Sequence, residues 1–408
     1  MPRPPRSLLE RGKDAARSLL RAGLAVAPPA LVTRLVDESQ RFDPANPSPP
    51  LAMPRDAEHD VRLLVAPTNS AGQGWAWARA AERLPGVVAR TMQIDMQRFQ
   101  QFSADQSVTR GEYRWSTRWQ RGQRRAVLAD VTHVLLESAS PLFGDPHRRD
   151  VRRELRALQR AGIRVALLFH GSDIRSPSRH RARVPSSPFG PGGWDQTAAL
   201  ERVTAENAAL IDEVDLPVFV STPDLFADVP GAQWLPVVVD PERWRTERAP
   251  MQGRERPLVV HIPSRSIVKG TDLIDPVLHR LANEGLIDYR SITGLSNAEM
   301  VAAYREADVV VDQLRIGVYG VAACEAMAAG RVVVSFVGAD ARREVRDRTG
   351  LEVPIVEADA DTFERVVRGL VADPAEALAV AAAGPAFVAE LHDGAFSARA
   401  LAGFLGRT

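Results

Sequence analysis

The stretch that decides the fold is ADVVVDQLRIGVYGVAACEAMAAGRVVV, residues 307–334. Its runs of valine predict buried strands over Asp308–Asp312 and Arg331–Val337, because short apolar runs of β-branched residues are typical of parallel sheets. Between them a helix is expected near Gly320–Ala329, since Gly320 suits the turn that opens a helix and Gly330 suits the position just after its end. A strand, a helix and a strand in this order predict a parallel βαβ unit.

The same alternation extends outward through both halves of the chain. Further strands are expected at Val61–Ala66, Val87–Ile94, Thr132–Glu137, Ile163–Phe169, Pro217–Ser221, Trp234–Val239 and Leu258–Ile262. Helices are expected near Trp75–Leu84, His147–Ala161, Gln196–Glu213, Thr271–Asn283 and Asn297–Ala307. The segment Asp240–Pro257 is charged and carries three prolines, which is typical of a domain boundary. We therefore predict two doubly wound α/β domains with a ligand site in the cleft between them.

The composition of the 408 residues excludes several classes of protein. Acidic and basic residues nearly cancel, 51 against 52, so no overall charge attracts nucleic acid. The single cysteine, Cys324, excludes an internal disulfide and a cysteine-based zinc site, and we interpret it as a small core residue. No window approaches about 18 consecutive apolar residues, so no membrane-spanning helix is predicted.

The beginning of the chain has a composition of its own. Between Met1 and Arg34 stand seven basic and two acidic residues, and a helix there would be amphipathic. Three interpretations stay open: a secretory signal, a helix docked on the body of the protein, and a helix lying on an anionic membrane surface. The segment Pro44–Pro54 reads as a linker.

Residues Ser264–Gly270 follow a predicted strand and open a helix. A helix N-terminus offers free N–H groups and partial positive charge, which suits a phosphate. Arg265 can hold a phosphate through two hydrogen bonds, and Lys269 adds a point charge. Lysine is rare in this chain, occurring only at positions 13 and 269, which draws attention to Lys269. The alternative is a solvated basic turn that caps a helix.

Glu325 is the only charged residue in the predicted helix segment Val321–Gly330. Burying a lone carboxylate is unfavourable by several kcal/mol, on the order of 2–7, unless it has hydrogen-bonding partners. The vicinal hydroxyls of a ribose are suitable partners. The alternative is that Glu325 lies on the solvent face of the helix.

The turn Asn69–Gly74 in the first half also follows a strand and opens a helix. Its glycines, Gly72 and Gly74, allow backbone to approach a ligand closely. Trp77 stands where a dinucleotide-binding motif would have its third glycine, which argues against that motif.

Polar residues His170, Asp173 and Arg175 follow the predicted strand Ile163–Phe169. Because they stand at the edge of the expected cleft, we interpret them as site residues, although a lone histidine is more often structural. The loop Ser176–Gly193 after them is long enough to be a functional lid or a disordered segment.

The Asp-x-Asp pattern at Asp359–Asp361 precedes an expected helix start. We interpret Asp361 as the N-cap of that helix, and we predict no metal site.

Taken together, these motifs resemble the retaining GT-B glycosyltransferases of the glycosyl transferases group 1, or family 4, type. The resemblance covers about Val61 to the C-terminus. Its motifs are Ala307–Asp312, Gly320, Glu325–Val334, Arg265, Lys269–Gly270, His170–Asp173 and Leu235–Asp240. It implies an α/β fold of the GT-B type, with two facing Rossmann-like domains. The implied division is 1–57 for an arm and linker, 58–245 for the acceptor-side domain, 246–385 for the nucleotide-sugar domain, and 386–408 for a helix that returns to the N-terminal domain.

The resemblance also implies roles for residues of the C-terminal domain. A nucleoside-diphosphate sugar would bind there, with Arg265 and Lys269 on its diphosphate. Glu325 would accept hydrogen bonds from the ribose, and backbone N–H groups around Gly320 and Val321 would contact phosphate.

For the N-terminal domain, the resemblance implies the acceptor side of the cleft. Gly72 and Gly74 would line it, and His170 would approach the transferred sugar. Asp173 and Arg175 would lie beside them.

One departure from the family pattern concerns a pair of glutamates eight residues apart. Glu325 matches the second, but the first position holds Gly317. Another residue must then orient the sugar ring, and we expect Gln313 or Tyr319 to do so.

The predicted function is metal-independent transfer of a sugar from a nucleoside-diphosphate sugar to an acceptor hydroxyl, with retention and no cofactor. The acceptor class stays open between a glycan, a lipid-linked molecule and a small molecule, and no nucleic acid is expected as a partner. Alternatives are a non-catalytic nucleotide-sugar-binding subunit and a sugar-nucleotide epimerase of the same fold. We expect a cytoplasmic protein, with residues 1–34 as the candidate for peripheral contact with the inner face of the membrane.

Overall fold

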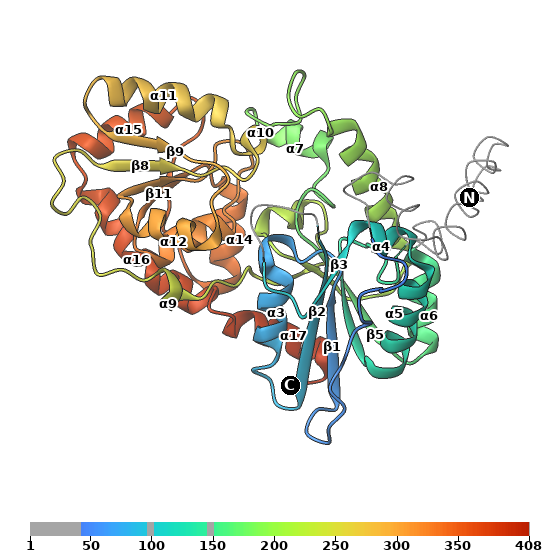
Figure 1. The fold of residues 1–408 in the computed structure, drawn as a ribbon. Helices are drawn as coiled ribbons and strands as arrows, with labels where there is room; N and C mark the ends of the chain where they lie inside the picture. The colour runs from blue at the N-terminus through green and yellow to red at the C-terminus, as the bar shows by residue number, and fades with distance from the viewer. Residues whose placement is uncertain (1–41, 96–101, 145–150, 408) are drawn as a thin grey trace.

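A computed structural model describes residues 42–95, 102–144 and 151–407 of the chain. Two parallel sheets, each flanked by helices, form two domains that lie side by side (Figure 1). The predicted fold class is confirmed. The interpretations of the basic arm concern residues 1–34, which lie outside the described residues.

The N-terminal sheet has the strand order β3-β2-β1-β4-β5-β6-β7, and all its pairings are parallel. The strands are β1 (Val61–Ala66), β2 (Val87–Asp95), β3 (Gln106–Thr109), β4 (His133–Glu137), β5 (Arg164–Phe169), β6 (Val218–Val220) and β7 (Gln233–Trp234). Alternate residues of β1 enter different parts of the core: Leu63 packs in the cluster of Trp77 and Leu401, and Leu64 packs in that of Trp119. This alternation follows from the two-residue period of a strand and explains why β1 is apolar throughout.

The C-terminal sheet has the order β12-β11-β10-β8-β9 and is also parallel. Its strands are β8 (Leu258–His261), β9 (Asp288–Ser291), β10 (Val309–Val311), β11 (Val332–Ser335) and β12 (Val356–Glu357). Asp308, which is fully buried at the start of β10, accepts N–H bonds from Met251 (2.6 Å) and Leu258 (2.7 Å). Asp308 therefore holds Met251, in the segment between the domains, against the C-terminal sheet.

Helices cover the faces of both sheets (Figure 1). In the N-terminal half they are α3 (Gln73–Ala81), α4 (Arg110–Trp115), α5 (Thr117–Asp130), α6 (Val151–Arg160), α7 (Pro177–Arg183) and α8 (Thr197–Glu213), with short 3₁₀ turns η2 (Ser70–Gly72) and η3 (Pro223–Ala227). In the C-terminal half they are α9 (Pro241–Trp244), α10 (Ser266–Lys269), α11 (Thr271–Asn283), α12 (Asn297–Glu306), α13 (Val321–Ala328), α14 (Ala339–Thr349), α15 (Phe363–Ala372), α16 (Ala375–Leu391) and α17 (Ala395–Leu405).

The last helix, α17, packs on the N-terminal domain rather than on the C-terminal one. Its Leu401 and Phe404 lie in the same core cluster as Trp77 of α3. Ser397 of the same helix donates to the carbonyl of Pro236 (2.9 Å). The chain thus crosses between the domains a second time after α16.

The structure also differs from the sequence prediction in several places. Residues 106–130, to which no elements were assigned, form β3, α4 and α5. The expected strand Trp234–Val239 is only the two-residue β7, because Pro236 has no N–H to extend the pairing. Asp361 is not the N-cap of α15; instead Asp359 accepts the N–H bonds of Asp361 (3.1 Å) and Thr362 (2.8 Å). An aspartate side chain can accept backbone N–H groups two and three residues further along the chain, and Asp359 rather than Asp361 stands at that distance from the helix start.

Among the residues that the structure describes, none of the helices combines the length and hydropathy that a membrane span requires.

Candidate functional site

The basic turn after β8 is held in place by the loop after β10. Leu314 N–H donates to the carbonyl of Lys269 (3.1 Å), and the Arg315 guanidinium donates to the carbonyl of Ile267 (3.1 Å). His261, at the end of β8, bridges the Val311 carbonyl and the Thr271 hydroxyl, at 2.9 Å each. The two loops therefore form one unit at the carboxyl edge of the sheet.

Lys269 lies in this unit and forms an ion pair with Asp312. The Asp312 side chain is only 2% exposed, whereas that of Lys269 is 18% exposed. One carboxylate oxygen of Asp312, Oδ2, has no hydrogen-bonding partner among the described residues. The ammonium group has three N–H donors, so it can keep Asp312 and still bind an incoming anion.

Arg265, the other predicted phosphate ligand, is exposed and lies over the ring of Trp194, 5.4 Å from its centroid. Trp194 belongs to the N-terminal domain. The structure therefore brings Arg265 and Lys269 into one turn and adds an aromatic contact from the facing domain, which the sequence did not indicate.

Glu325 lies on α13, whose other residues fix its orientation. Ala323, Cys324, Ala326 and Met327 are buried, and the helix packs closely on α16. At Gly384 of α16, an added Cβ would come within 2.8 Å of the Met327 carbonyl oxygen, so only glycine permits this approach. Glu325 is left on the partly exposed side of the helix.

The carboxylate of Glu325 makes no hydrogen bond or ion pair with any residue in the described part of the chain. Burial raises the pKa of Glu325 to about 8. The positive charges of Arg243 and Lys269 partly offset this effect, and the negative charge of Asp312 adds to it. Glu325, Lys269 and Asp312 thus form one electrostatically coupled group.

The N-terminus of α13 adjoins this group. Gly320 is its N-cap, and no side chain caps the helix. The N–H groups of Val321 and the residues after it are therefore available to a ligand.

Gln313 and Tyr319 do not reach the site as expected. The Gln313 side chain is buried and organises its own loop: it donates to the carbonyls of Val318 (3.1 Å) and Phe336 (2.5 Å). Its carbonyl oxygen accepts the N–H bonds of Arg315 and Ile316. All its hydrogen-bonding capacity is used within the loop.

Tyr319 is 2% exposed and lies in the core. Its ring contacts Phe387 and His392, with its hydroxyl 3.3 Å from His392 Nε2. Gly317 has a φ of 76°, and a Cβ there would lie 3.2 Å from the Phe336 ring. The departure from the paired glutamates is therefore built into the backbone of this loop.

On the N-terminal side, Asn69 organises the glycine turn. Its side chain donates to Gln93 (2.7 Å) and accepts the Trp75 N–H (3.0 Å) at the start of α3. Gly72 is the N-cap of α3, and its Cα lies beside Phe102. Gly74 is buried within this turn.

His170 and Asp173 lie together after β5. The Asp173 carboxylate accepts the backbone N–H of His170 (3.0 Å) and of Gly171 (2.8 Å), and the hydroxyl of Ser138 (2.6 Å). The His170 ring stacks on Trp77, with 5.6 Å between centroids. Arg175 is buried and paired with Asp224, whose Oδ2 lies 2.7 Å from its Nε, and its guanidinium packs against Gly171.

The sequence analysis missed one carboxylate in this group. Glu137, the last residue of β4, is fully buried, and its Oε1 lies 3.1 Å from His170 Nε2. The available signal was a single acidic residue at the carboxyl end of an otherwise apolar strand.

The long loop after His170 connects the domains. His180 of α7 contacts the Ile316 carbonyl through Nε2 (3.1 Å), and Ser186 donates to the Leu314 carbonyl (2.8 Å). Burial lowers the pKa of His180 to about 4, so its ring is neutral near pH 7. With Trp194 over Arg265, the loop reaches the same unit that carries Lys269 (Figure 1). It is ordered, in part as α7, and its position fits the lid interpretation.

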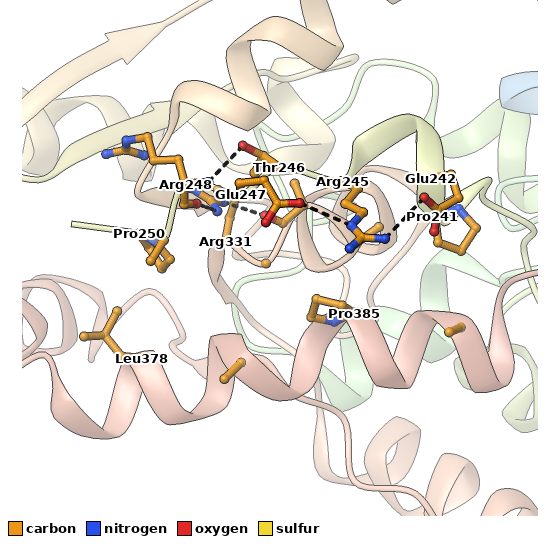
Figure 2. Close-up of a pocket in the computed structure, with 16 residues that line it drawn as sticks. Pro241, Glu242, Arg245, Thr246, Glu247, Arg248, Pro250, Arg331, Leu378 and Pro385 are labelled. Carbon is orange, nitrogen blue, oxygen red and sulfur yellow. Dashed lines mark hydrogen bonds and ion pairs between the residues drawn. The ribbon is translucent and has the colours of Figure 1, made fainter. Parts of the chain in front are cut away.

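A pocket of about 690 Å³ lies elsewhere, between α16 and the segment that follows α9 (Figure 2). Its lining includes Arg245, Arg248 and the turn Ala328–Arg331 at the far end of α13 from Gly320. Arg331 there donates to the carbonyls of Ala329, Ala307 and Arg248. None of the predicted site residues lines this pocket.

Comparisons with known proteins agree with this architecture. Residues 257–373 match the family model of glycosyl transferases group 1. Among curated proteins, none matches the chain. Sucrose-phosphate synthase from Thermosynechococcus elongatus aligns with a TM-score of 0.52 and 13% identity, over 83% of this chain and 96% of that one.

Two further solved structures give similar values. HepE from Anabaena in complex with UDP aligns with a TM-score of 0.52 and 12% identity, over 85% of this chain and 99% of that one. A glycosyltransferase from Rickettsia africae aligns with a TM-score of 0.51 and 9% identity, over 86% and 98%. The chain therefore has the GT-B fold, and residues 257–373 match the family model of glycosyl transferases group 1.

Proposed function

We propose that this protein transfers a sugar from a nucleoside-diphosphate sugar to an acceptor hydroxyl, with retention of the anomeric configuration and without a metal ion. The family match covers the domain that carries Arg265, Lys269 and Glu325. The HepE structures of the same fold hold UDP, or UDP and glucose.

The observation that carries the proposal is the carboxylate of Glu325, which no described residue hydrogen-bonds or pairs with, on a helix with an uncapped N-terminus and within the electrostatic influence of Lys269. An acceptor for hydroxyls, a row of N–H donors and a cation are what a ribose and a diphosphate require. Two separate segments, α13 and the basic turn with Lys269, supply these groups, which is the arrangement of a binding site rather than of a solvated turn.

In the transfer, the bond between the anomeric carbon and the diphosphate oxygen breaks, and the diphosphate gains negative charge. Lys269, Arg265 and the N–H groups at Val321 would stabilise that charge, since fixed donors need no reorganisation when the charge develops. The acceptor oxygen bonds to the anomeric carbon, and its proton passes to the departing diphosphate.

The acceptor side would be formed by the Gly72–Gly74 turn, His170 and Asp173. The loop that carries His180 and Trp194 joins this side to the donor turn. An acceptor bound under this loop would be screened from water, which limits hydrolysis of the donor. Glycans, lipid-linked acceptors and small molecules are all compatible with this arrangement.

A second candidate is a nucleotide-sugar-binding subunit without activity. Gly317 has no side chain, and those of Gln313 and Tyr319 are engaged within the core, so none of these three residues offers a group to orient the sugar ring. This observation favours binding without transfer.

The experiment measures binding and turnover together. Thermal shifts with UDP, GDP, dTDP, ADP and their common sugars identify the donor, since a ligand at about 100 times its Kd stabilises the folded state by about 2.7 kcal/mol. The identified sugar nucleotide is then assayed for transfer and for slow hydrolysis. Binding without either reaction supports the second candidate, and no binding by any nucleotide refutes both.

We also propose peripheral contact with an anionic membrane through residues 1–34. The described chain begins beside α5, where Arg118 donates to the carbonyl of Ala45 (3.2 Å). The exposed arginines of α5 line a shallow pocket of about 460 Å³: Arg121, Arg124 and Arg125. The described chain thus begins close to a cationic surface, which would act together with the basic residues of the arm to attract anionic lipid.

A further inference from the structure

Glu137 and His170 form a buried pair at the carboxyl edge of the N-terminal sheet. Glu137 is 0% exposed, and its Oε1 lies 3.1 Å from Nε2 of His170. The contact is not aligned as an ideal hydrogen bond. However, neither atom has another hydrogen-bonding partner among the described residues. Each therefore depends on the other to compensate for its burial.

The carboxylate cannot move away from the histidine. Its second oxygen, Oε2, accepts the backbone N–H groups of Thr68 (2.9 Å) and Asn69 (2.8 Å). At Gly74, even an added Cβ would lie 3.2 Å from Oε1. Glu137 is thus fixed on one side by the turn after β1 and leaves one oxygen for His170.

The imidazole is held from its other sides as well. Trp77 stacks on the imidazole with an interplanar angle of 22°. The backbone N–H of His170 donates to the carboxylate of Asp173. The side chain keeps 12% exposure. Because Nε2 meets Glu137, Nδ1 is the ring nitrogen that remains for a ligand.

The charges around the ring determine its protonation. Burial by itself lowers the pKa of His170, but the contact with Glu137 and its charge, and the charge of Asp173, raise the pKa above its ordinary value. These two carboxylates are the titratable groups that act on the ring. In the neutral form, a proton on Nε2 leaves Nδ1 as an acceptor; in the charged form, Nδ1 is a donor.

We propose that Glu137 is a positioning residue, which keeps the proton of His170 on Nε2 and presents Nδ1 to the bound sugar or to the acceptor hydroxyl. This inference rests on the proposed function for the identity of the ligand. The state of the His170 ring, however, belongs to the free protein and can be measured without any reaction.

The first test is ¹⁵N NMR of histidine-labelled protein, with the signal of His170 assigned from His170→Ala. In the wild type, His170 titrates above its ordinary pKa, with Nε2 protonated in the neutral form. In Glu137→Gln the pKa falls and the preference for this tautomer is lost.

Glu154→Gln is the matched control. Glu154 is also a buried carboxylate of the N-terminal domain and accepts two backbone N–H groups, from Leu142 (2.5 Å) and Phe143 (3.0 Å). No hydrogen bond or ion pair joins it to His170 in the described structure. An unchanged His170 signal in Glu137→Gln, or an equal change in Glu154→Gln, overturns the proposal.

The second test uses kinetics with the donor found in the binding screen. Glu137→Gln lowers kcat by about tenfold or more, as expected when a histidine is held in the wrong tautomer, and leaves the KM of the donor within about threefold. The limb of the pH profile that belongs to His170 moves to lower pH, together with its NMR titration.

These outcomes separate the two levels of the argument. A fall in kcat with an unchanged His170 titration shows that Glu137 only shapes the turn at Thr68–Asn69, and it overturns the positioning role. If the wild type binds no nucleotide, the proposed function fails, while the NMR result still decides whether Glu137 sets the state of His170.

Discussion

Replacing Glu325 with glutamine tests the donor site most directly, because the substitution keeps the shape of the side chain and removes its charge. In the free protein, burial raises the pKa of Glu325 to about 8, so the carboxyl group is mostly protonated near pH 7. Ribose hydroxyls donate best to the ionised form. Donor binding should therefore release a proton, and donor affinity should rise with pH up to about 8.

The magnitude follows from this pKa and from the strength of a charged hydrogen bond. At about pH 6.5, ionising a group of pKa about 8 costs about 2 kcal/mol, whereas at about pH 8.5 the cost has nearly vanished. A hydrogen bond to a charged group contributes about 1.5–3 kcal/mol. The donor affinity of the wild type should thus be close to that of Glu325→Gln at the lower pH, and about 10- to 100-fold higher than that of the variant at the higher pH.

Isothermal titration of wild type and Glu325→Gln with the same sugar nucleotide, at several pH values, measures this difference. Glu325→Gln serves as the control for titration of the ligand and of other residues, because these titrations are common to both proteins. Wild-type affinity that does not increase relative to the variant between about pH 6.5 and 8.5 would refute the ribose-anchor role of Glu325.

Four other outcomes are expected. Lys269→Ala should destabilise the protein by about 3 kcal/mol in urea unfolding, because it leaves Asp312 buried and unpaired. Adding Asp312→Asn should recover part of this stability, whereas binding of the nucleoside diphosphate should stay weak. Gly384→Ala should cost about 1–3 kcal/mol because its Cβ would meet the Met327 carbonyl, whereas Gly403→Ala, with open space around it, should not destabilise. Transfer activity should survive excess EDTA; activity that vanishes and returns with Mn²⁺ or Mg²⁺ contradicts metal independence. Deletion of residues 1–34 should reduce co-sedimentation with anionic vesicles and leave donor binding intact, and equal sedimentation of both proteins would exclude the membrane role.

Local sequence patterns predicted the regular elements around the site because the signals there are strong. The valine runs became β10 and β11, and the alanine-rich segment between Gly320 and Gly330 became α13. Residues 106–130 were missed because α5 buries only a narrow stripe, which includes Trp119 and Val127, within a helix that is otherwise polar and rich in arginine. Periodicity detects a helix poorly when so few positions are apolar.

For the donor site, residue chemistry and position were sufficient to select Arg265, Lys269 and Glu325, and the structure brings Lys269 close enough for its charge to act on the pKa of Glu325. They were not sufficient for Gln313 and Tyr319. Both were selected as polar side chains near Gly317, but whether a side chain faces a ligand or the core depends on packing from elsewhere in the chain. The carbonyls of Val318 and Phe336 accept the hydrogen bonds of the Gln313 side chain. His392, the C-cap of α16, contacts the hydroxyl of Tyr319.

The sequence by itself determined the two-domain α/β architecture, the order of the strands around residues 307–334, and the basic and acidic residues on the donor side. These depend on hydrophobic period, turn residues and charge, which are local properties of the chain. The tertiary structure alone decided which groups meet across the sheets: Asp312 with Lys269, Glu137 with His170, and the loop of His180 with the Ile316 carbonyl. Such contacts join residues far apart in the sequence, and they arise only when parallel strands bring their carboxyl ends to a common edge and the two domains face each other.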